Sequence, residues 1–399
     1  MPDHGHSVVL SNAPWTSSGY GNQTALTVPR IQAAGHSVSL SCFYGLEGGM
    51  ISWNGIQCFP TDDSRFGFNM LGDYAHIAGQ GDRQSVKVFT LMDVWVMLPA
   101  LQKLTGLEFV CWTPFHLDPI PPGIQHFLQG TQARAIGMSK WGQAQLQNCG
   151  LDAMYAPHAI DTNLFRPRPP DERRMIREAL KVPADAFVVG MVGVNQGIPS
   201  RKAFPEVFEA FAEFRRRHND AILFLHTDMF GQQRGLQLLP LAEHTDIPRD
   251  AILHTDQTAY RLGLPVHEVA QLMGMFDVLA MPSYGEGFGI PLIESQASGV
   301  PVITTDWTAM TELCGSGWLV DGERIYDGTQ GSFMKKPNVG DIVDALEEAY
   351  AKRGDEKVAQ AAREFAVGYD IEKVFAECWL PILAEVERPR EVAPLRLAA

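Results

Sequence analysis

The chain has 399 residues, enough for about two domains that each bury a core, and 45% of its residues are hydrophobic and 20% charged. This balance excludes a disordered or fibrous protein. The 32 basic and 46 acidic side chains give a net charge of −14, which argues against nucleic acid or an anionic membrane as a partner, because the overall field repels polyanions.

The sequence contains no stretch of about 20 apolar residues of the kind that spans a bilayer. Its first residues lack the basic and apolar regions of a signal peptide. Six cysteines are scattered without a C-x-x-C pair or the spacing of a zinc finger. We therefore expect a cytoplasmic protein with reduced thiols and no transmembrane segment.

Short β-type runs alternate with helical patterns through the first part of the chain. The runs lie at 7–13, 36–42, 86–91, 107–112 and 133–138. This alternation predicts a parallel sheet covered by helices. Gly19 and Gly21 interrupt the first strand-to-helix turn, a feature that a purely structural turn also explains. The aromatic and glycine-rich segment 41–59 either lines an acceptor site or forms core and turns.

The loop after the run at 107–112 presents His116 and Asp118 on a segment stiffened by prolines. A rigid loop at the carboxyl end of a parallel strand can hold polar groups over a ligand. A lone histidine in such a loop is equally compatible with an ordinary hydrogen-bonded residue. Both interpretations therefore stay open at this point of the chain.

A charged, proline-rich stretch at 166–174 separates two series of strands. Prolines remove backbone donors and charges oppose burial, which favours a linker. Residues 371–387 are predicted as a helix kinked at Pro381, which packs back toward the N-terminal domain and precedes a polar tail. The predicted organisation is an N-terminal domain over 1–166, a linker over 167–174, a C-terminal domain over 175–370 and the C-terminal helix and tail over 371–399.

Strand-like runs resume in the second series. They lie at 186–194, 221–227, 277–283 and 300–305. Between the first two, Arg201 and Lys202 stand where a glycine-containing loop leads into an amphipathic helix over 203–217. Adjacent cations at such a turn suit a diphosphate, because fixed positive charge stabilises a leaving diphosphate without reorganisation. A solvated basic pair without a ligand is the alternative interpretation.

The most informative segment is 281–306, where a strand ends, a glycine-rich turn follows, a helix begins and a second strand starts. Gly285, Gly287 and Gly289 let the backbone approach a ligand closely. The N–H groups from Phe288 onward open the helix, and a helix N-terminus attracts anions. The turn therefore suits a phosphate-containing ligand.

Two glutamates, Glu286 and Glu294, stand in this segment with seven residues between them. Glu286 in the turn can face a sugar hydroxyl, and Glu294 in the helix can accept two hydrogen bonds from a ribose diol. Together they would bind both ends of a sugar nucleotide. A glycine turn that only shapes the chain, with Glu294 solvated or favoured by the helix dipole, is the alternative interpretation.

The stretch 282–303 resembles the signature of retaining glycosyltransferases of family 4, whose paired glutamates have this spacing. The resemblance covers most of residues 7–350. It implies the GT-B fold, an α/β architecture in which two Rossmann-like domains, each a parallel sheet with helices on both faces, face each other across a cleft. It also implies that Glu286 contacts the transferred sugar and that Glu294 binds the nucleotide ribose in the C-terminal domain.

The same resemblance implies that Arg201 and Lys202 hold the donor phosphates, together with the helix start at 287–289. Relatives often carry an arginine slightly upstream, where this chain has Asn195 or Gln196. This departure leaves one phosphate contact without an expected partner.

In the N-terminal domain, the resemblance implies that the loop at Gly19 approaches the donor diphosphate from the opposite side. It also implies that a polar residue after the strand at 107–112 lies near the donor sugar. His116 and Asp118 compete for that role, because the correspondence can shift by a residue or two.

The expected activity is that of a retaining glycosyltransferase, which moves a sugar from a nucleotide-diphosphate sugar to an acceptor hydroxyl. We expect neither metal nor cofactor, because no D-x-D motif occurs and cations and helix ends meet the phosphates. Three alternatives stay open: a sugar-nucleotide epimerase of the same architecture, a non-catalytic sugar-nucleotide-binding protein, and a glycosyltransferase acting on a modified nucleic-acid base. No motif identifies the donor base, the sugar, the acceptor or the oligomeric state.

Overall fold

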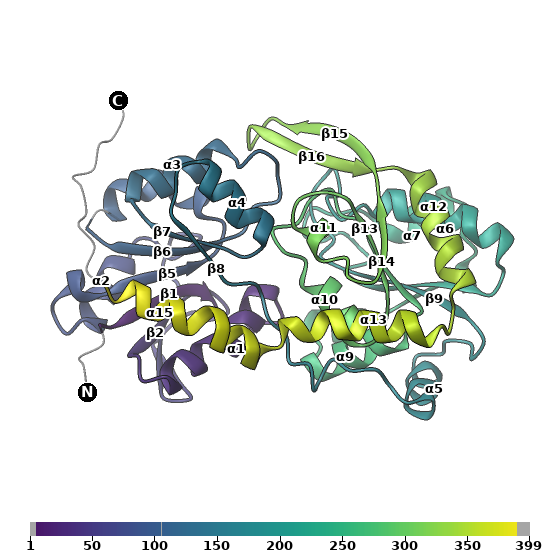
Figure 1. Cartoon of the computed structure of the whole chain (residues 1–399), viewed down its shortest axis with the longest axis horizontal. Coiled ribbons are helices and arrows are strands. Elements are labelled where there is room, and N and C mark those ends of the chain that lie inside the picture. The colour runs from purple at the N-terminus through teal and green to yellow at the C-terminus, as the bar shows by residue number, and fades with distance from the viewer. Residues whose placement is uncertain (1–4, 105, 389–399) are drawn as a thin grey trace. The chain divides into compact units, whose positions relative to one another are not determined.

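The structure is a computed structural model that describes residues 5–104 and 106–388 (Figure 1). Contacts within the chain define two compact units. The N-terminal unit comprises Met1–Ala159, Gly328–Ser332 and Ile371–Ala399, and the C-terminal unit comprises Ile160–Asp327 and Phe333–Asp370. The chain therefore changes unit just after Ala159, a few residues before the linker predicted at 167–174.

In the described residues, the N-terminal unit is built on an eight-stranded sheet in the order β3-β4-β2-β1-β5-β6-β7-β8. Its strands are β1 (Ser7–Asn12), β2 (Val38–Tyr44), β3 (Ile51–Trp53), β4 (Ile56–Phe59), β5 (Lys87–Leu91), β6 (Glu108–Thr113), β7 (Arg134–Gly137) and β8 (Ala153–Tyr155). Neighbours pair in parallel except β3 and β4. The five predicted runs correspond to β1, β2, β5, β6 and β7, which confirms the parallel sheet.

Segment 41–59 proves to contain a β-hairpin. Strands β3 and β4 are joined by Asn54 and Gly55, whose φ angles are 51° and 79°. An Asn-Gly pair with both φ angles positive is the turn that best matches the twist of a two-residue hairpin. Strand β4 is largely buried and β3 is largely exposed. Part of this segment therefore belongs to the core, and the Asn-Gly signal could have revealed it.

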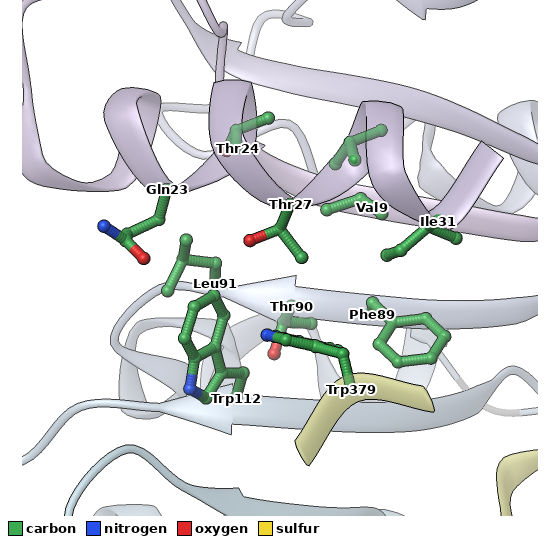
Figure 2. Close-up of a pocket in the computed structure, with 11 residues that line it drawn as sticks. Val9, Gln23, Thr24, Thr27, Ile31, Phe89, Thr90, Leu91, Trp112 and Trp379 are labelled. Atoms are coloured by element: carbon green, nitrogen blue, oxygen red, sulfur yellow. The ribbon is translucent and has the colours of Figure 1, made fainter. Parts of the chain in front are cut away.

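Helices cover the sheet of the N-terminal unit. They are α1 (Gly19–Ala33), α2 (Leu71–Ala78), η1 (Arg83–Ser85), η2 (Val94–Leu104), α3 (Pro122–Thr131) and α4 (Lys140–Asn148). Helix α1 turns Thr24, Thr27, Val28 and Ile31 toward the core. Between α1 and strand β5 lies a small cavity, shown in Figure 2, into which Thr27 and Thr90 project.

The C-terminal segment returns to this unit as α14 (Ile371–Val374), the π-helical turn η5 (Phe375–Trp379) and α15 (Leu380–Val386). The residues predicted as one helix over 371–387 are thus helical in three successive pieces, the last of which ends at Val386. Its irregularity lies at η5, where the Leu380 N–H donates to the Phe375 carbonyl, directly before Pro381, which has no N–H of its own. The Trp379 ring packs on Trp112, with 4.9 Å between ring centroids, and so anchors the segment.

As far as the chain is described, the C-terminal unit contains a six-stranded parallel sheet in the order β11-β10-β9-β12-β13-β14. Its strands are β9 (Phe187–Val192), β10 (Ala221–His226), β11 (Ile252–His254), β12 (Val278–Met281), β13 (Val302–Thr305) and β14 (Gly317–Val320). The predicted runs correspond to β9, β10, β12 and β13. The edge strands β11 and β14 are three and four residues long and partly exposed, so they carry little hydrophobic signal.

Helices and a separate ribbon complete the C-terminal unit. The helices are α5 (Pro170–Ala179), α6 (Phe204–Arg217), α7 (Leu238–His244), η3 (Arg249–Ala251), α8 (Gln257–Leu262), α9 (Val266–Met275), α10 (Ile290–Ala297), α11 (Ala309–Glu312), α12 (Val339–Ala351), α13 (Glu356–Ala366) and η4 (Val367–Tyr369). Strands β15 (Gly322–Asp327) and β16 (Ser332–Pro337) form the ribbon, which the sequence did not predict. The phenylalanines of α6 are buried in the core, as expected.

Helix α5 begins inside the stretch predicted as a linker. Pro170 suits the first helical turn because its missing N–H needs no partner there. The charges of this stretch are not simply solvated: Arg173 and Arg177 each reach the buried carboxylate of Asp277 at 2.8 Å. This charged and proline-rich stretch therefore forms a helix that is fixed to the C-terminal unit through Asp277.

Candidate functional site

The turn between β12 and α10 lies at the carboxyl end of the sheet in the C-terminal unit. Gly289 occupies the N-cap of α10 with a φ of 108°, and a Cβ added there would come within 3.2 Å of Leu292 and Met281. Only glycine fits both the conformation and the space. No side chain caps this helix start. Pro291 at its second position has no N–H, and the Leu292 N–H donates to the Gly289 carbonyl at 2.9 Å. The main-chain donors that the start of α10 can offer an anion are therefore the N–H groups of Gly289 and Ile290.

The structure brings the predicted cations onto this turn. Lys202 Nζ donates to Glu286 Oε1 at 2.5 Å, and Arg201 Nη1 lies 3.0 Å from the same oxygen. Arg201 also donates to the carbonyl oxygen of Gly285 at 2.5 Å. Both cations share Oε1, which leaves Oε2 of Glu286 without an ionic partner among the described residues.

The charges in this cluster hold Glu286 ionised. Burial alone would raise the pKa of the Glu286 carboxyl, but the charges of Arg201 and Lys202 and the Lys202 hydrogen bond bring that pKa well below its usual range. Burial lowers the pKa of the Lys202 ammonium, against the opposing effect of Glu286. The cluster is thus a carboxylate between two cations, placed beside an open helix N-terminus.

Glu294 lies on the second turn of α10 in a very different environment. It is buried, yet its carboxyl group has no hydrogen-bond or ionic partner within residues 5–104 and 106–388. Burial raises the pKa of Glu294 to about 8. A buried carboxyl group without a partner lowers the stability of the folded chain. It is also free to bind hydroxyl groups of a ligand.

Two further contacts fix the turn, and the sequence analysis did not name them. The Tyr284 hydroxyl donates to Glu206 Oε1 at 2.7 Å, and the Tyr284 N–H donates to the Arg201 carbonyl at 2.8 Å. The Thr308 hydroxyl bonds to the main chain of Glu286. Glu206 follows the cation pair on the buried face of α6, where an acidic residue is unusual enough to have been a signal.

The position upstream of the cations is occupied by a structural residue. Asn195 is almost fully buried, and its amide donates to the carbonyls of Asp228 and Leu236 and accepts from the Leu236 N–H. Asn195 therefore fastens two loops together and has no spare group for a phosphate. The neighbouring Gln196 forms a single bridge with Gln233.

The other predicted site residues belong to the turn before α10 and to two loops of the N-terminal unit. The Phe288 ring is buried against Tyr369, with 5.8 Å between centroids, so only its main chain is offered to a ligand, as at the half-buried Gly287. In the N-terminal unit, Gly19 is the exposed first residue of α1. His116 and Asp118 are both half-buried in the loop after β6, and nothing in their burial favours one over the other.

The described part of the chain shows neither a metal site nor a membrane-spanning helix. In it, no group of three or more His, Cys, Asp and Glu side chains could hold a metal ion. No helix there is long and apolar enough to cross a membrane.

Comparison with known families and sequences gives the following matches. Residues 172–365 match the family model of glycosyl transferases group 1. The D-inositol 3-phosphate glycosyltransferase of Arthrobacter sp. (strain FB24) is 29% identical over 269 residues, covering 64% of this chain and 55% of that protein. The protein of the same name from Paenarthrobacter aurescens (strain TC1) is 29% identical over 196 residues, covering 49% and 42%. The chain spans about half the length of these curated relatives.

Solved structures resemble the chain over nearly its whole length. A glycosyltransferase from Rickettsia africae ESF-5 superposes with a TM-score of 0.71 at 16% identity, covering 96% of this chain and 99% of that one. Anabaena Alr3699/HepE in complex with UDP-glucose gives 0.67 at 15% identity, with coverage of 96% and 99%. The α/β fold with two parallel-sheet domains, expected as GT-B, is thereby confirmed.

Proposed function

We propose that this chain, which carries a glycosyl transferases group 1 domain over 172–365, is a retaining glycosyltransferase of family 4. It transfers a sugar from a nucleotide-diphosphate sugar to an acceptor hydroxyl and requires no metal ion. The observation that carries the proposal is the arrangement around α10: two cations meet the turn at Glu286, while Glu294 is buried and has no partner among the residues that the structure describes.

Each group has a role that its chemistry supports. Arg201, Lys202 and the N–H groups at the start of α10 stabilise the charge that grows on the departing diphosphate. Oε2 of Glu286 accepts a hydrogen bond from a hydroxyl group of the transferred sugar. The carboxyl group of Glu294 binds the ribose diol. Both ends of a nucleotide sugar then find partners along one turn and one helix.

Glu286 does not act as a nucleophile or as a general acid in this proposal. Its carboxylate is already engaged by two cations that keep its pKa low, which suits neither role. The bond between the anomeric carbon and the diphosphate oxygen breaks, and the acceptor oxygen bonds to the same face of that carbon. The acceptor proton passes to the leaving phosphate.

The family resemblance also suggests roles for residues of the N-terminal unit. We assign to the Gly19 loop an approach to the diphosphate, and to His116 or Asp118 a contact near the transferred sugar. UDP-glucose, bound by Alr3699/HepE, is the first donor to test. D-inositol 3-phosphate, named in the curated relatives, is the first acceptor.

The test begins with thermal shifts against UDP-glucose, UDP-N-acetylglucosamine and GDP-mannose, because a ligand that binds only the folded state raises Tm by mass action. The donor that gives the largest shift is then incubated with D-inositol 3-phosphate and other acceptors. NMR of the anomeric proton should show retention, and EDTA should leave the rate unchanged.

The opposite outcomes separate the alternatives. Free epimerised donor would identify an epimerase, and tight donor binding without turnover on any acceptor would identify a binding protein. An inverted product would exclude the retaining mechanism, and loss of activity in EDTA would exclude metal independence. Absence of any shift in the panel would contradict the donor site itself.

A further inference from the structure

The main chain at Thr308 adopts a conformation that its residue type rarely takes. Thr308 precedes α11 with φ 51° and ψ −137°. Positive φ is strained for a β-branched side chain, because Cβ and its substituents collide with the backbone. Strain of this kind persists only where the surroundings impose it, and it concentrates at functional sites.

The strained residue holds the main chain of Glu286. The buried Thr308 hydroxyl accepts a hydrogen bond from the Glu286 N–H at 3.2 Å and donates one to the Glu286 carbonyl oxygen at 3.0 Å. One hydroxyl thus satisfies both main-chain polar groups of one residue. On the preceding residue, Arg201 donates to the Gly285 carbonyl. The peptide units on both sides of Glu286 are therefore fixed.

This clamp determines where the Glu286 carboxylate can point. The main chain sets the direction of the Cα–Cβ bond, and the two cations hold Oε1. With both ends of the side chain held, the positions open to Oε2 are restricted. The residue before Thr308 is itself packed, since the Arg324 guanidinium and the Lys335 ammonium lie 5.6 Å and 5.4 Å from the Trp307 ring centroid.

We propose that Thr308 is a positioning residue, whose hydroxyl orients Glu286 toward the transferred sugar. The inference rests on the proposed function, because it assigns a purpose to the clamp only if Glu286 contacts the sugar of a nucleotide-sugar donor. It goes beyond that function because it distinguishes binding of the sugar from binding of the nucleotide. The clamp contributes to binding of the sugar and does not affect binding of the nucleotide.

The experiment compares Thr308→Val, Thr308→Ser and Thr308→Gly with the wild type. Valine keeps the shape and removes the hydroxyl, serine keeps the hydroxyl, and glycine removes both the hydroxyl and the strain. Calorimetry gives Kd for the best donor of the thermal-shift panel and for its nucleoside diphosphate, and release of the nucleoside diphosphate gives kcat.

In Thr308→Val we expect the donor to bind more weakly while the nucleoside diphosphate binds as before. We expect kcat to fall on the order of 10- to 100-fold, as misplacement of a contacting group does. Thr308→Ser should retain activity within a few fold. Thr308→Gly should be as impaired as Thr308→Val although its Tm is higher than that of Thr308→Val, because the strain is relieved. A merely structural hydroxyl would not separate stability from activity in this way.

Thr304→Val is the matched control. Thr304 is also buried in the C-terminal unit and donates to a main-chain carbonyl, that of Met281 at 3.0 Å, without contacting Glu286. If Thr308→Val lowers Tm as Thr304→Val does and keeps the wild-type kcat and the wild-type ratio of the two Kd values, the inference is overturned while donor binding stands. If the wild type binds no donor in the panel, the proposed function fails and the inference falls with it.

Discussion

Two buried carboxylates in the C-terminal unit stand in opposite environments. Asp277 is bound by Arg173 and Arg177 and accepts the Val188 N–H at 2.7 Å. The Glu294 side chain is also buried but has no such partner in the described chain. A buried carboxyl group without partners costs free energy, so Glu294 is not retained for stability. The difference separates a carboxylate that the fold uses from one that we assign to a ligand.

Glu286 falls between these two cases. It has two cationic partners, like Asp277, but the proposal requires those same cations to bind the donor diphosphate. The partners of Asp277 belong to the fold, whereas the partners of Glu286 can be shared with a ligand. Removing the charge of Asp277 should therefore lower stability, and removing that of Lys202 should lower turnover. Removing the carboxyl group of Glu294 should raise stability and weaken nucleotide binding.

The largest expected effect is that of Asp277→Ala on stability. It leaves the buried Arg177 without its ionic partner, and breaking a buried pair in this way costs about 3 to 5 kcal/mol. Urea unfolding monitored by circular dichroism measures the loss. Asp171→Ala is the control, because its pair with Arg174 is exposed and surface pairs contribute about 0 to 1 kcal/mol. Equal losses in the two variants would contradict the structural role of the Asp277 cluster.

Lys202→Ala should have the next largest effect, and on rate. Removal of one preorganised donor that stabilises transition-state charge typically costs about 100-fold or more. We expect kcat for donor turnover to fall by about that factor. Stability should fall less than in Asp277→Ala, because Arg201 still pairs with Glu286. Lys352→Ala is the control, because that lysine also pairs with a glutamate but is half exposed. Unchanged turnover in Lys202→Ala would show that the cation pair does not hold the phosphates.

Glu294→Gln should reverse the usual relation between stability and function. The pKa of Glu294 is raised to about 8 in the folded chain, against 4.5 for an unperturbed glutamate. Between these two pH values the unfolded state loses the proton and the folded state keeps it, so wild-type stability falls as pH rises. Glutamine cannot ionise. The difference in Tm in favour of Glu294→Gln should grow from about pH 4.5 to about pH 8 and then stay constant.

The same variant should bind the nucleotide more weakly, because it removes the carboxylate assigned to the ribose diol. In the wild type, affinity for the nucleoside diphosphate should rise with pH toward 8, as the carboxylate forms. Calorimetry at pH 6, 7 and 8 measures this trend, and Glu294→Gln should show none of it. A variant that is less stable at every pH and binds nucleotide normally would make Glu294 a structural residue.

The features that the sequence predicted are those that a short run of neighbouring residues determines. The long apolar runs predicted most strands of both sheets, and the glycine turn with its two glutamates predicted the segment that Arg201 and Lys202 contact. The Tyr284–Glu206 contact and the Thr308 clamp were not predictable, because each joins residues that are distant in sequence and carry no motif. The charges of α5 were read as a sign of solvent exposure, since their partner Asp277 lies about 100 residues away in the chain.

The smallest expected effect is in the N-terminal unit. It tests whether a buried polar group that lacks a hydrogen-bond partner is by itself a sign of a ligand site. The hydroxyls of Thr27 and Thr90 lie buried beside the small cavity under α1 (Figure 2), and neither finds a nitrogen or oxygen partner in the described part of the chain. The cavity is lined mainly by apolar groups, and nothing charged faces it. Unlike Glu294, these hydroxyls adjoin no helix N-terminus and no cation pair. We therefore expect their lack of partners to be a cost of packing alone.

Thr27→Val should then stabilise the chain by about 1 kcal/mol, because it removes a polar group that no partner satisfies and keeps the shape. Tm should rise by about 2 to 4 °C, and donor binding should not change. Thr24→Val on the same helix is the control: the Thr24 hydroxyl donates to the Tyr20 carbonyl at 2.8 Å and lies within hydrogen-bond distance of the Ser11 hydroxyl at 2.9 Å, so the loss should destabilise. If both variants destabilise equally, a water molecule or ligand bonds to Thr27, and the distinction between the two regions weakens.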